Sequence, residues 1–151
     1  MKICFTSSSG GHFEQLLMLK DLFPEFESFV VTEQTKYNKD FALLPTYFTK
    51  QVNRQNILFI FPFFYNIFLS IYILLKEKPK IIVSTGVLST IPLCLFAKLL
   101  RVKIIYIESF AKINSATLTG KLMYKIADVF YVQWPEMLKV YPDAKYVGGI
   151  Y

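Results

Sequence analysis

The chain is short, apolar and basic: its 151 residues are 54% apolar and carry a formal net charge of +6. This length predicts one domain, 1–151, and leaves no room for a second nucleotide-binding domain beside it. One histidine and two distant cysteines exclude a zinc site, so we predict neither a metal nor another cofactor.

The chain opens on a predicted strand at 2–6, which leads directly into Ser7-Ser8-Ser9-Gly10-Gly11-His12; a helix is predicted over 13–23. Small residues between a strand and a helix are typical of an anion site, because glycine lets a ligand approach the backbone and the first helical N–H groups face it. The alternative is that the glycines only make the corner. The loop is neither a Walker A motif nor a dinucleotide fingerprint. Since a strand pattern begins at once, we expect no signal peptide.

Strand and helix patterns alternate along the rest of the chain, with an irregular polar segment at 33–44. This alternation predicts an α/β domain with a doubly wound, mainly parallel sheet. Cys4 and Cys94 fall in apolar segments, which is typical of buried, reduced thiols in a cytoplasmic protein. The predicted strands are 29–32, 46–52, 80–84, 104–107, 128–132 and 145–147; the predicted helices are 57–75, 89–100, 118–127 and a short one from Pro135.

The most unusual segment is 57–75, nineteen residues without a charge, whose length and hydropathy match a transmembrane helix. Strands are predicted on both sides of it, and if they share one sheet the chain cannot cross a bilayer between them. We therefore favour a helix that packs on the sheet with one side and dips into the membrane interface with the other. A spanning helix and a buried core helix are the alternatives. The predicted membrane contacts are Phe59, Phe61, Phe63, Phe64 and Phe68.

The distribution of charge favours a membrane over a nucleic acid as the partner. Between Lys50 and Lys125 there are eleven basic and two acidic residues, and this is also the most apolar part of the chain. A basic, apolar region suits an anionic membrane surface. Nucleic-acid binders interleave basic and aromatic residues, whereas here the aromatic residues form an uncharged run. We predict no nucleic-acid partner.

Three polar segments follow predicted strands, namely 9–12, 84–86 and Glu108-Ser109. In a doubly wound sheet, ligands bind beyond the carboxyl ends of the strands, where the strand order reverses. The sequence therefore predicts that these segments meet in one cleft.

Four motifs in this order resemble those of Alg14-type oligosaccharide biosynthesis proteins, and the resemblance covers essentially the whole chain. They are Ser-Ser-Gly-Gly-His at 8–12, Ser-Thr-Gly at 84–86, Ile107-Glu108-Ser109-Phe110 and Gln133-Trp134-Pro135. The bacterial members, found in capsule and exopolysaccharide gene clusters, look closest, since this chain shows no membrane helix at its N-terminus of the kind that eukaryotic members have.

The resemblance implies the fold of the N-terminal half of a GT-B glycosyltransferase, the half that holds a lipid-linked acceptor. In this family the two halves are separate chains, so it implies a donor-binding partner of the Alg13 type. Together they would transfer a hexose from a UDP-sugar to a lipid-pyrophosphate-linked glycan at the cytoplasmic face of a bacterial plasma membrane. Two other hypotheses stay open: a non-catalytic scaffold that recruits and stimulates its partner, and a stand-alone nucleotide-binding protein.

Carried over to this sequence, the resemblance implies that Gly10 and Gly11 cradle the pyrophosphate of the acceptor at the start of the first helix. Ser9, Gly86 and Ser109 would line the same acceptor site. Gly86 marks either a close approach of the backbone or only a corner.

His12 and Glu108 are the candidate catalytic residues. His12 would be a general base near the attacked sugar hydroxyl, or else would cap the turn or bond a neighbouring strand. Glu108 would hold a sugar hydroxyl or orient the cleft, or else would form a salt bridge with Lys112. Trp134 would stack on a sugar, fill the partner interface, or fill the core.

Overall fold

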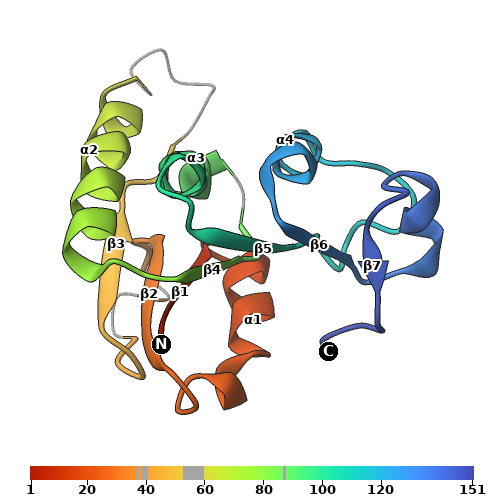
Figure 1. The fold of residues 1–151 in the computed structure, drawn as a ribbon, viewed down its shortest axis with the longest axis horizontal. Coiled ribbons are helices and arrows are strands. Elements are labelled where there is room, and N and C mark those ends of the chain that lie inside the picture. The colour runs from red at the N-terminus through yellow and green to blue at the C-terminus, as the bar shows by residue number, and fades with distance from the viewer. Residues whose placement is uncertain (37, 39–40, 53–59, 87) are drawn as a thin grey trace.

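Seven strands form one parallel sheet in the computed structural model, which describes residues 1–36, 38, 41–52, 60–86 and 88–151. Their order is β3-β2-β1-β4-β5-β6-β7, which confirms the predicted doubly wound fold (Figure 1). The strands are β1 Lys2–Ser7, β2 Glu27–Glu33, β3 Thr46–Thr49, β4 Ile81–Ser84, β5 Lys103–Ile107, β6 Val129–Val132 and β7 Lys145–Tyr146. The helices are α1 Gly11–Leu17, α2 Ile60–Glu77, α3 Ile91–Leu99 and α4 Leu118–Ile126, with the 3₁₀ helices η1 Lys20–Leu22, η3 Leu88–Thr90 and η4 Pro135–Lys139.

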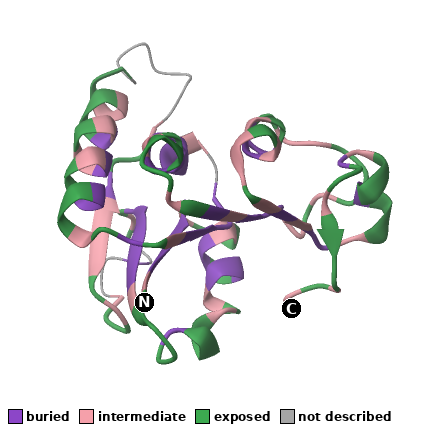
Figure 2. Cartoon of the chain, viewed as in Figure 1, coloured by how far each residue is buried: buried purple, intermediate pink, exposed green. Residues whose placement is uncertain are grey.

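Helices α2, α3 and α4 cover one face of the sheet, and α1 covers the other (Figure 1). Side chains alternate between the two faces along β1, so that Cys4 enters the core under α2 and α3 while Ile3 and Phe5 enter the core under α1. Both faces of the central strands are therefore buried, as in other parallel sheets (Figure 2). Cys4 and Cys94 are buried free thiols, as predicted, and burial raises the pKa of Cys94 to about 12.

The helix predicted over 13–23 has the wrong bounds. Helix α1 begins at Gly11 and ends at Leu17, and the short helix η1 follows it. The amide of Leu19 donates to the carbonyl of Leu16, three residues back, so the chain tightens into a 3₁₀ turn at this point. Pro24 then prevents any continuation as an α-helix.

The strand predicted over 46–52 is also shorter than expected, because the residue after Thr49 is held by a helix instead of by a strand. The side-chain amide of Asn66 accepts the N–H of Lys50 and donates to the carbonyl of Lys50, each at 2.8 Å. Ser70 Oγ donates to the carbonyl of Asn66 at 2.6 Å. Asn66 and Ser70 are buried together with Ile73 and Leu74, so these two polar residues of α2 face inward with its core residues.

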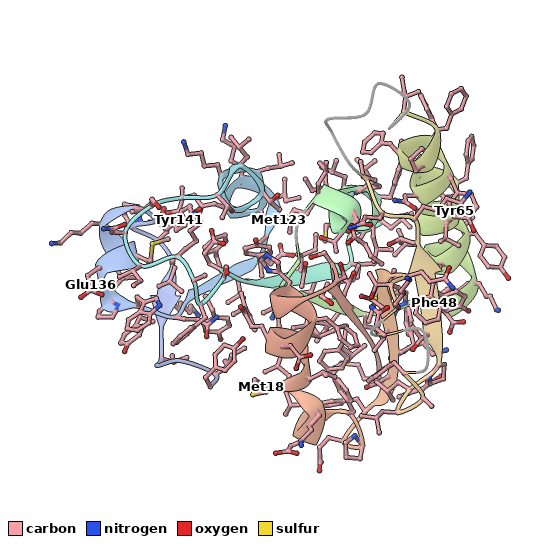
Figure 3. The ribbon with its side chains drawn as sticks, turned by 180° about the vertical axis from the view of Figure 1, so that it is seen from behind. Met18, Phe48, Tyr65, Met123, Glu136 and Tyr141 are labelled. Carbon is pink, nitrogen blue, oxygen red and sulfur yellow. The ribbon has the colours of Figure 1, made fainter. Side chains whose placement is uncertain are left out.

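The apolar side of α2 faces outward. The side chains of Phe61 and Phe68 are each 71% exposed and that of Phe64 is 51% exposed. Tyr65 also lies on the outer side of the helix (Figure 3). Only 22% of the 18 residues of α2 are buried, so the alternative of an ordinary core helix is wrong. Residues 57–59 of the predicted helix, including Phe59, lie outside the described residues.

Among the described helices, α2 is the one long and apolar enough to cross a membrane by length and composition. Its two flanking strands nevertheless belong to one sheet, because β3 pairs with β2, β2 with β1 and β1 with β4. A helix that crossed a bilayer would place these strands on opposite sides of the membrane. The fold is therefore incompatible with a spanning α2.

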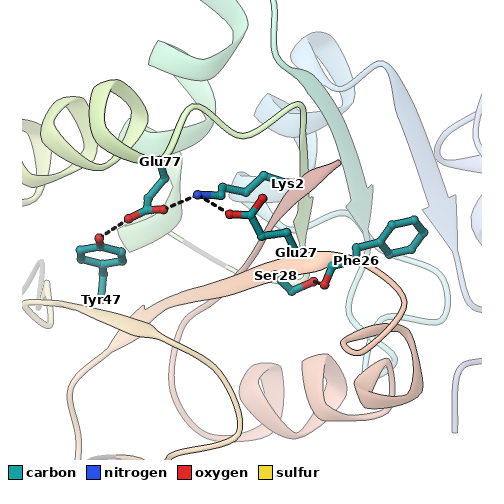
Figure 4. Close-up of polar contacts among 6 residues, drawn as sticks. All are labelled: Lys2, Phe26, Glu27, Ser28, Tyr47 and Glu77. Carbon is teal, nitrogen blue, oxygen red and sulfur yellow. Dashed lines mark hydrogen bonds and ion pairs between the residues drawn. The ribbon is translucent and has the colours of Figure 1, made fainter.

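The C-terminal end of α2 is fixed by a small polar network (Figure 4). The carboxylate of Glu77 accepts hydrogen bonds from the Tyr47 hydroxyl and, at 3.0 Å, from Lys2 Nζ; Lys2 also pairs with Glu27 at 2.7 Å. These contacts join α2 to β1 and β3. The Tyr47 hydroxyl first, and Lys2 second, lower the pKa of the Glu77 carboxyl below its ordinary value.

We expect Glu77→Gln to lower the free energy of unfolding by about 1–2 kcal/mol at neutral pH, because a charged acceptor is lost. Since the pKa of Glu77 is lower in the folded state, its contribution is present above the unfolded value and is lost as the pH falls through the folded value. Urea unfolding at neutral pH and at about pH 3 measures this, and the difference between the two proteins should close at the lower pH.

Glu25→Gln is the matched control, since Glu25 is exposed and forms no ion pair within the described part of the chain. A stability difference for Glu77→Gln that persisted unchanged in acid would contradict the assigned network.

Candidate functional site

The three polar segments predicted to converge do lie together. They follow β1, β4 and β5, which are neighbours in the sheet. Strands β1 and β4 pair although they are not consecutive, so the strand order reverses between them. The segments 7–12 and 84–86 therefore flank the point where doubly wound sheets bind ligands.

The glycine loop between β1 and α1 is open on its outer side. Gly10 has a φ of +67°, and its carbonyl accepts the amides of Phe13 at 2.8 Å and Glu14 at 3.1 Å. A Cβ atom added to Gly10 or Gly11 would meet nothing within 4 Å. The first amides of a helix have no partner within the helix, so those of Gly11 and His12 are placed to meet a ligand.

His12 is tied to the end of β4 by two hydrogen bonds. Its Nδ1 lies 2.8 Å from the carbonyl oxygen of Thr85, and Thr85 Oγ1 donates to the carbonyl of His12 at 2.9 Å. Because a carbonyl oxygen can only accept, Nδ1 carries the proton and Nε2 of the neutral ring keeps a lone pair. The predicted bond to a neighbouring strand end is thus confirmed, and it leaves the ring able to accept a proton at Nε2.

Ser9 is already engaged by a carboxylate that the sequence did not point to. Glu33, a buried residue at the end of β2, accepts Ser9 Oγ at 3.1 Å and the Ser9 amide at 3.4 Å. An anion bound by Ser9 would have to replace this carboxylate. The backbone of Gly10 and Gly11 is therefore the more accessible part of the predicted anion site.

Gly86 makes a close approach to the chain itself. An added Cβ would lie 2.6 Å from Thr90 Cγ2, 2.8 Å from Ser7 Cα and 2.9 Å from the Ser8 amide nitrogen. The residue lets the end of β4 pack against the end of β1, so the structure explains this glycine without a ligand. Its part in acceptor binding stays a prediction.

Glu108 is buried inside the protein. Its side chain is 1% exposed; Oε2 accepts the Tyr141 hydroxyl at 2.8 Å and Oε1 accepts the Ser109 amide at 2.9 Å, with Thr117 Oγ1 at 3.4–3.5 Å from both. Burial, and then the bond to Glu108, hold the pKa of Tyr141 well above its ordinary value. The carboxylate therefore has its hydrogen-bond partners inside the protein. Within the described residues it forms no salt bridge with Lys112.

Two buried glutamines, whose role the sequence did not reveal, fix the segment after β5. Gln15 Nε2 and Gln133 Nε2 donate to the carbonyl of Glu108 at 3.2 and 2.9 Å. Gln15 Oε1 accepts the Phe110 amide, and Gln133 Oε1 accepts the Ile150 amide, both at 3.1 Å. One feature of the sequence could have revealed the role of Gln15: it is an uncharged polar residue on the apolar side of a helix.

Ser109 and Trp134 also form hydrogen bonds within the segment after β5. Ser109 Oγ accepts the amide of Ala111 at 3.3 Å, which stabilises the turn. Trp134 Nε1 donates to the Phe110 carbonyl at 2.6 Å, and its ring centroid lies 4.9 Å from that of Phe110. Trp134 therefore packs on the loop of its own chain, which supports the core alternative among its three predicted roles.

The predicted membrane residues divide into two sets. Phe61, Phe64 and Phe68 are exposed on the outer side of α2. Phe63 instead lines a groove of about 530 Å³ between α2 and α3, together with Ile67, Pro92, Leu95, Phe96, Lys98, Leu99 and Ile126.

We expect Gly86→Ala to destabilise the protein by about 1–3 kcal/mol, because the added methyl group meets backbone atoms that cannot move freely. Gly11→Ala is the matched control: its Cβ enters open space, so no loss of stability is expected. Denaturant unfolding of both variants measures the difference. Equal stabilities would show that the contact between the β1 and β4 ends is loose.

Comparison with solved structures supports the fold. MurG of Acinetobacter baumannii superposes with a TM-score of 0.69 at 19% identity, over 89% of this chain and 42% of that one. A UDP-N-acetylglucosamine 2-epimerase from Rickettsia bellii gives 0.73 at 16% identity, over 99% and 45%. At such identities the likeness shows the fold alone. It confirms the predicted fold class, that of one half of a GT-B glycosyltransferase.

Comparison with curated sequences shows the family. The "UDP-N-acetylglucosamine transferase subunit ALG14" of Mus musculus is 31% identical over 108 residues, 68% of this chain and 50% of the mouse protein. The protein of the same name from Yarrowia lipolytica is 40% identical over 79 residues, 48% and 37%. The chain thus spans half the length of the mouse protein. A family profile described as "Oligosaccharide biosynthesis protein Alg14 like" matches residues 24–150, and the chain belongs to this family.

Proposed function

We propose that this chain is the membrane-associating, acceptor-binding subunit of a two-chain glycosyltransferase. The two chains together would transfer a hexose from a UDP-sugar to a lipid-pyrophosphate-linked glycan. The observation that carries the proposal is the orientation of α2, which buries Asn66 and Ser70 and exposes Phe61, Phe64 and Phe68. The names of the mouse and Yarrowia relatives, each a UDP-N-acetylglucosamine transferase subunit, support it.

The outer side of α2 suits the boundary between lipid headgroups and acyl chains. Phe61, Phe64 and Phe68 offer a continuous apolar surface, and burying each ring is worth about 1.5–3 kcal/mol. Two cations border this surface: Nζ of Lys50 lies 4.5 Å from the ring centre of Tyr65, and Nζ of Lys76 lies 5.5 Å from that of Tyr72. An aromatic surface bordered by cations favours a helix that lies in the plane of an anionic bilayer.

The glycine loop would then hold the reacting end of the acceptor. The backbone of Gly10 and Gly11 would bind its pyrophosphate, and Ser9, Gly86 and Ser109 would line the same acceptor site. Nε2 of His12 would take the proton of the acceptor hydroxyl as that oxygen attacks the anomeric carbon of the donor sugar. The bond between the sugar and UDP breaks in the same step, and UDP leaves with the electron pair.

The donor site would belong to a second chain of the Alg13 type. We further propose that the pair acts in capsule or exopolysaccharide synthesis at the cytoplasmic face of a bacterial plasma membrane. The four motifs that resemble the bacterial members of the family support this setting. The main alternative is a non-catalytic scaffold, in which the chain only recruits and stimulates the partner.

We expect His12→Ala to lower kcat of the reconstituted pair by about 10²–10⁴-fold, because the proton acceptor is lost. Glycosyl transfer to a lipid-linked acceptor in vesicles is the measurement. Glu14→Ala, an exposed change on the same helix, is the control and should leave transfer unchanged. If the pair with His12→Ala kept full activity, the scaffold alternative would be favoured.

Replacing Phe61, Phe64 and Phe68 together by Ser should reduce co-sedimentation with anionic vesicles by more than about tenfold, given the apolar area that is lost. Replacing Met18, Leu22 and Leu43 by Ser is the control. It removes exposed apolar side chains elsewhere on the surface and should have little effect. Equal sedimentation of the two triple variants would argue against α2 as the membrane contact.

A further inference from the structure

A basic surface lies at the edge of the sheet where the strands begin, opposite the glycine loop. Two hollows of about 270 and 330 Å³ meet there and share Arg101 and Val102. They lie where α2 and α3 end. The charged residues that line them are Lys78, Lys80, Lys98, Arg101, Lys103 and Asp128.

The charges at this edge are unbalanced. Asp128 is the acidic residue of the set, and its carboxylate is already bonded to Lys98 Nζ at 2.6 Å and to the Ile104 amide at 2.8 Å. Lys78, Lys80, Arg101 and Lys103 are exposed, and none of them forms an ion pair in the part of the chain that the structure describes. The surface is therefore complementary to an anion.

Two of these cations occupy positions that normally suit glycine. Lys78 directly follows α2 with a φ of +47°, and Arg101 follows Leu100, the C-cap residue of α3, with a φ of +59°. Among the described residues, the others with positive φ are Gly10 and Gly148. Glycine would adopt this conformation at both helix ends without steric cost. Both helices instead place a long cation beside the same hollow.

Apolar side chains surround the cations. Leu75, Leu99 and Leu100 are 59%, 77% and 53% exposed. Leu75 lies seven residues after Phe68, on the same outer side of α2, so the apolar surface of this helix continues to the basic hollow. Leu99 and Lys98 also line the groove between α2 and α3. A ligand that fits this edge has an anionic head and an apolar body.

We propose that this edge binds the headgroup phosphate of an anionic phospholipid, with Lys78 and Arg101 as its principal contacts. The inference rests on the membrane contact of the proposed function. The lipid is a component of the bilayer and not the glycosyl acceptor, because the acceptor pyrophosphate is assigned to the opposite edge of the sheet. Strand β4 alone, with four residues, separates the two edges by about 13 Å. Contacts at both ends of α2 would hold this helix in the plane of the membrane.

Lys78→Gly combined with Arg101→Gly tests the proposal without straining the backbone. The probe is binding to vesicles of phosphatidylcholine with an equal amount of phosphatidylglycerol, compared with phosphatidylcholine alone. We expect the double variant to keep or raise Tm and to bind the anionic vesicles about 25-fold more weakly, since each cation near the surface contributes about fivefold. Binding to neutral vesicles should change little.

Lys139→Ala combined with Lys145→Ala is the control, since it removes two exposed cations near β7. Lys80→Ala with Lys103→Ala is a second test variant, whose residues have no positive φ, and it should also weaken anionic binding more than the control does. If both test variants bind as the control does, the headgroup site is wrong while the membrane contact stands. If the unaltered protein ignores both kinds of vesicle, the membrane contact itself is wrong.

Discussion

The orientation of α2 depends on the side-chain amide of Asn66, which acts together with the buried Ile73 and Leu74. The amide pairs with both the N–H and the carbonyl of Lys50, which is how another strand would pair with that residue. Asn66 is buried, and leaving its amide without partners would cost about 1–3 kcal/mol, so this contact favours the observed rotation of the helix. In this rotation Asn66, Ser70, Ile73 and Leu74 are buried and the aromatic side is exposed. A polar contact thus helps to determine which surface of the helix is offered to a membrane.

The cleft depends on a second polar system. Gln15 and Gln133 both donate to the carbonyl of Glu108, whose carboxylate accepts the Tyr141 hydroxyl. These hydrogen bonds fasten the segment after β5 to α1 and to the end of β6. Buried polar networks of this kind hold their members in one arrangement when every member is satisfied. We infer that these residues position the wall of the cleft. Of the two candidate catalytic residues, Glu108 has its carboxylate bonded to Tyr141, whereas His12 is bonded through Nδ1 and its Nε2 forms no hydrogen bond among the described residues.

The sequence was enough to predict the fold class, the order of the elements and the convergence of three strand ends. Hydrophobic alternation and the small residues after β1 and β4 are local signals, and a doubly wound sheet brings its strand ends together whatever their details. The direction of a side chain is not a local signal. Glu108 follows a strand, as a catalytic carboxylate would. Its carboxylate is nevertheless buried, where it accepts a hydrogen bond from Tyr141, thirty-three residues later in the chain.

The apolar run of α2 is a second case in which the sequence does not determine which way side chains face. Composition alone is equally consistent with a spanning, a buried or an interfacial helix. The presence of β3 and β4 in the same sheet excludes the spanning helix, and the exposure of the aromatic residues excludes the buried helix. The end of α1 and the end of β3 could not be predicted either, since they are set by Pro24 together with a 3₁₀ turn and by Asn66, sixteen residues after Lys50.

The central claim is that one side of α2 lies in the membrane interface while the other holds the sheet. Nitroxide labels placed one at a time on the described residues of α2, with oxygen accessibility measured in vesicles, test it most directly. The account predicts accessibility that repeats with the helical period of about 3.6 residues and peaks at 61, 64, 68, 72 and 75. Uniformly high accessibility around the helix, or no change when vesicles are added, would contradict it.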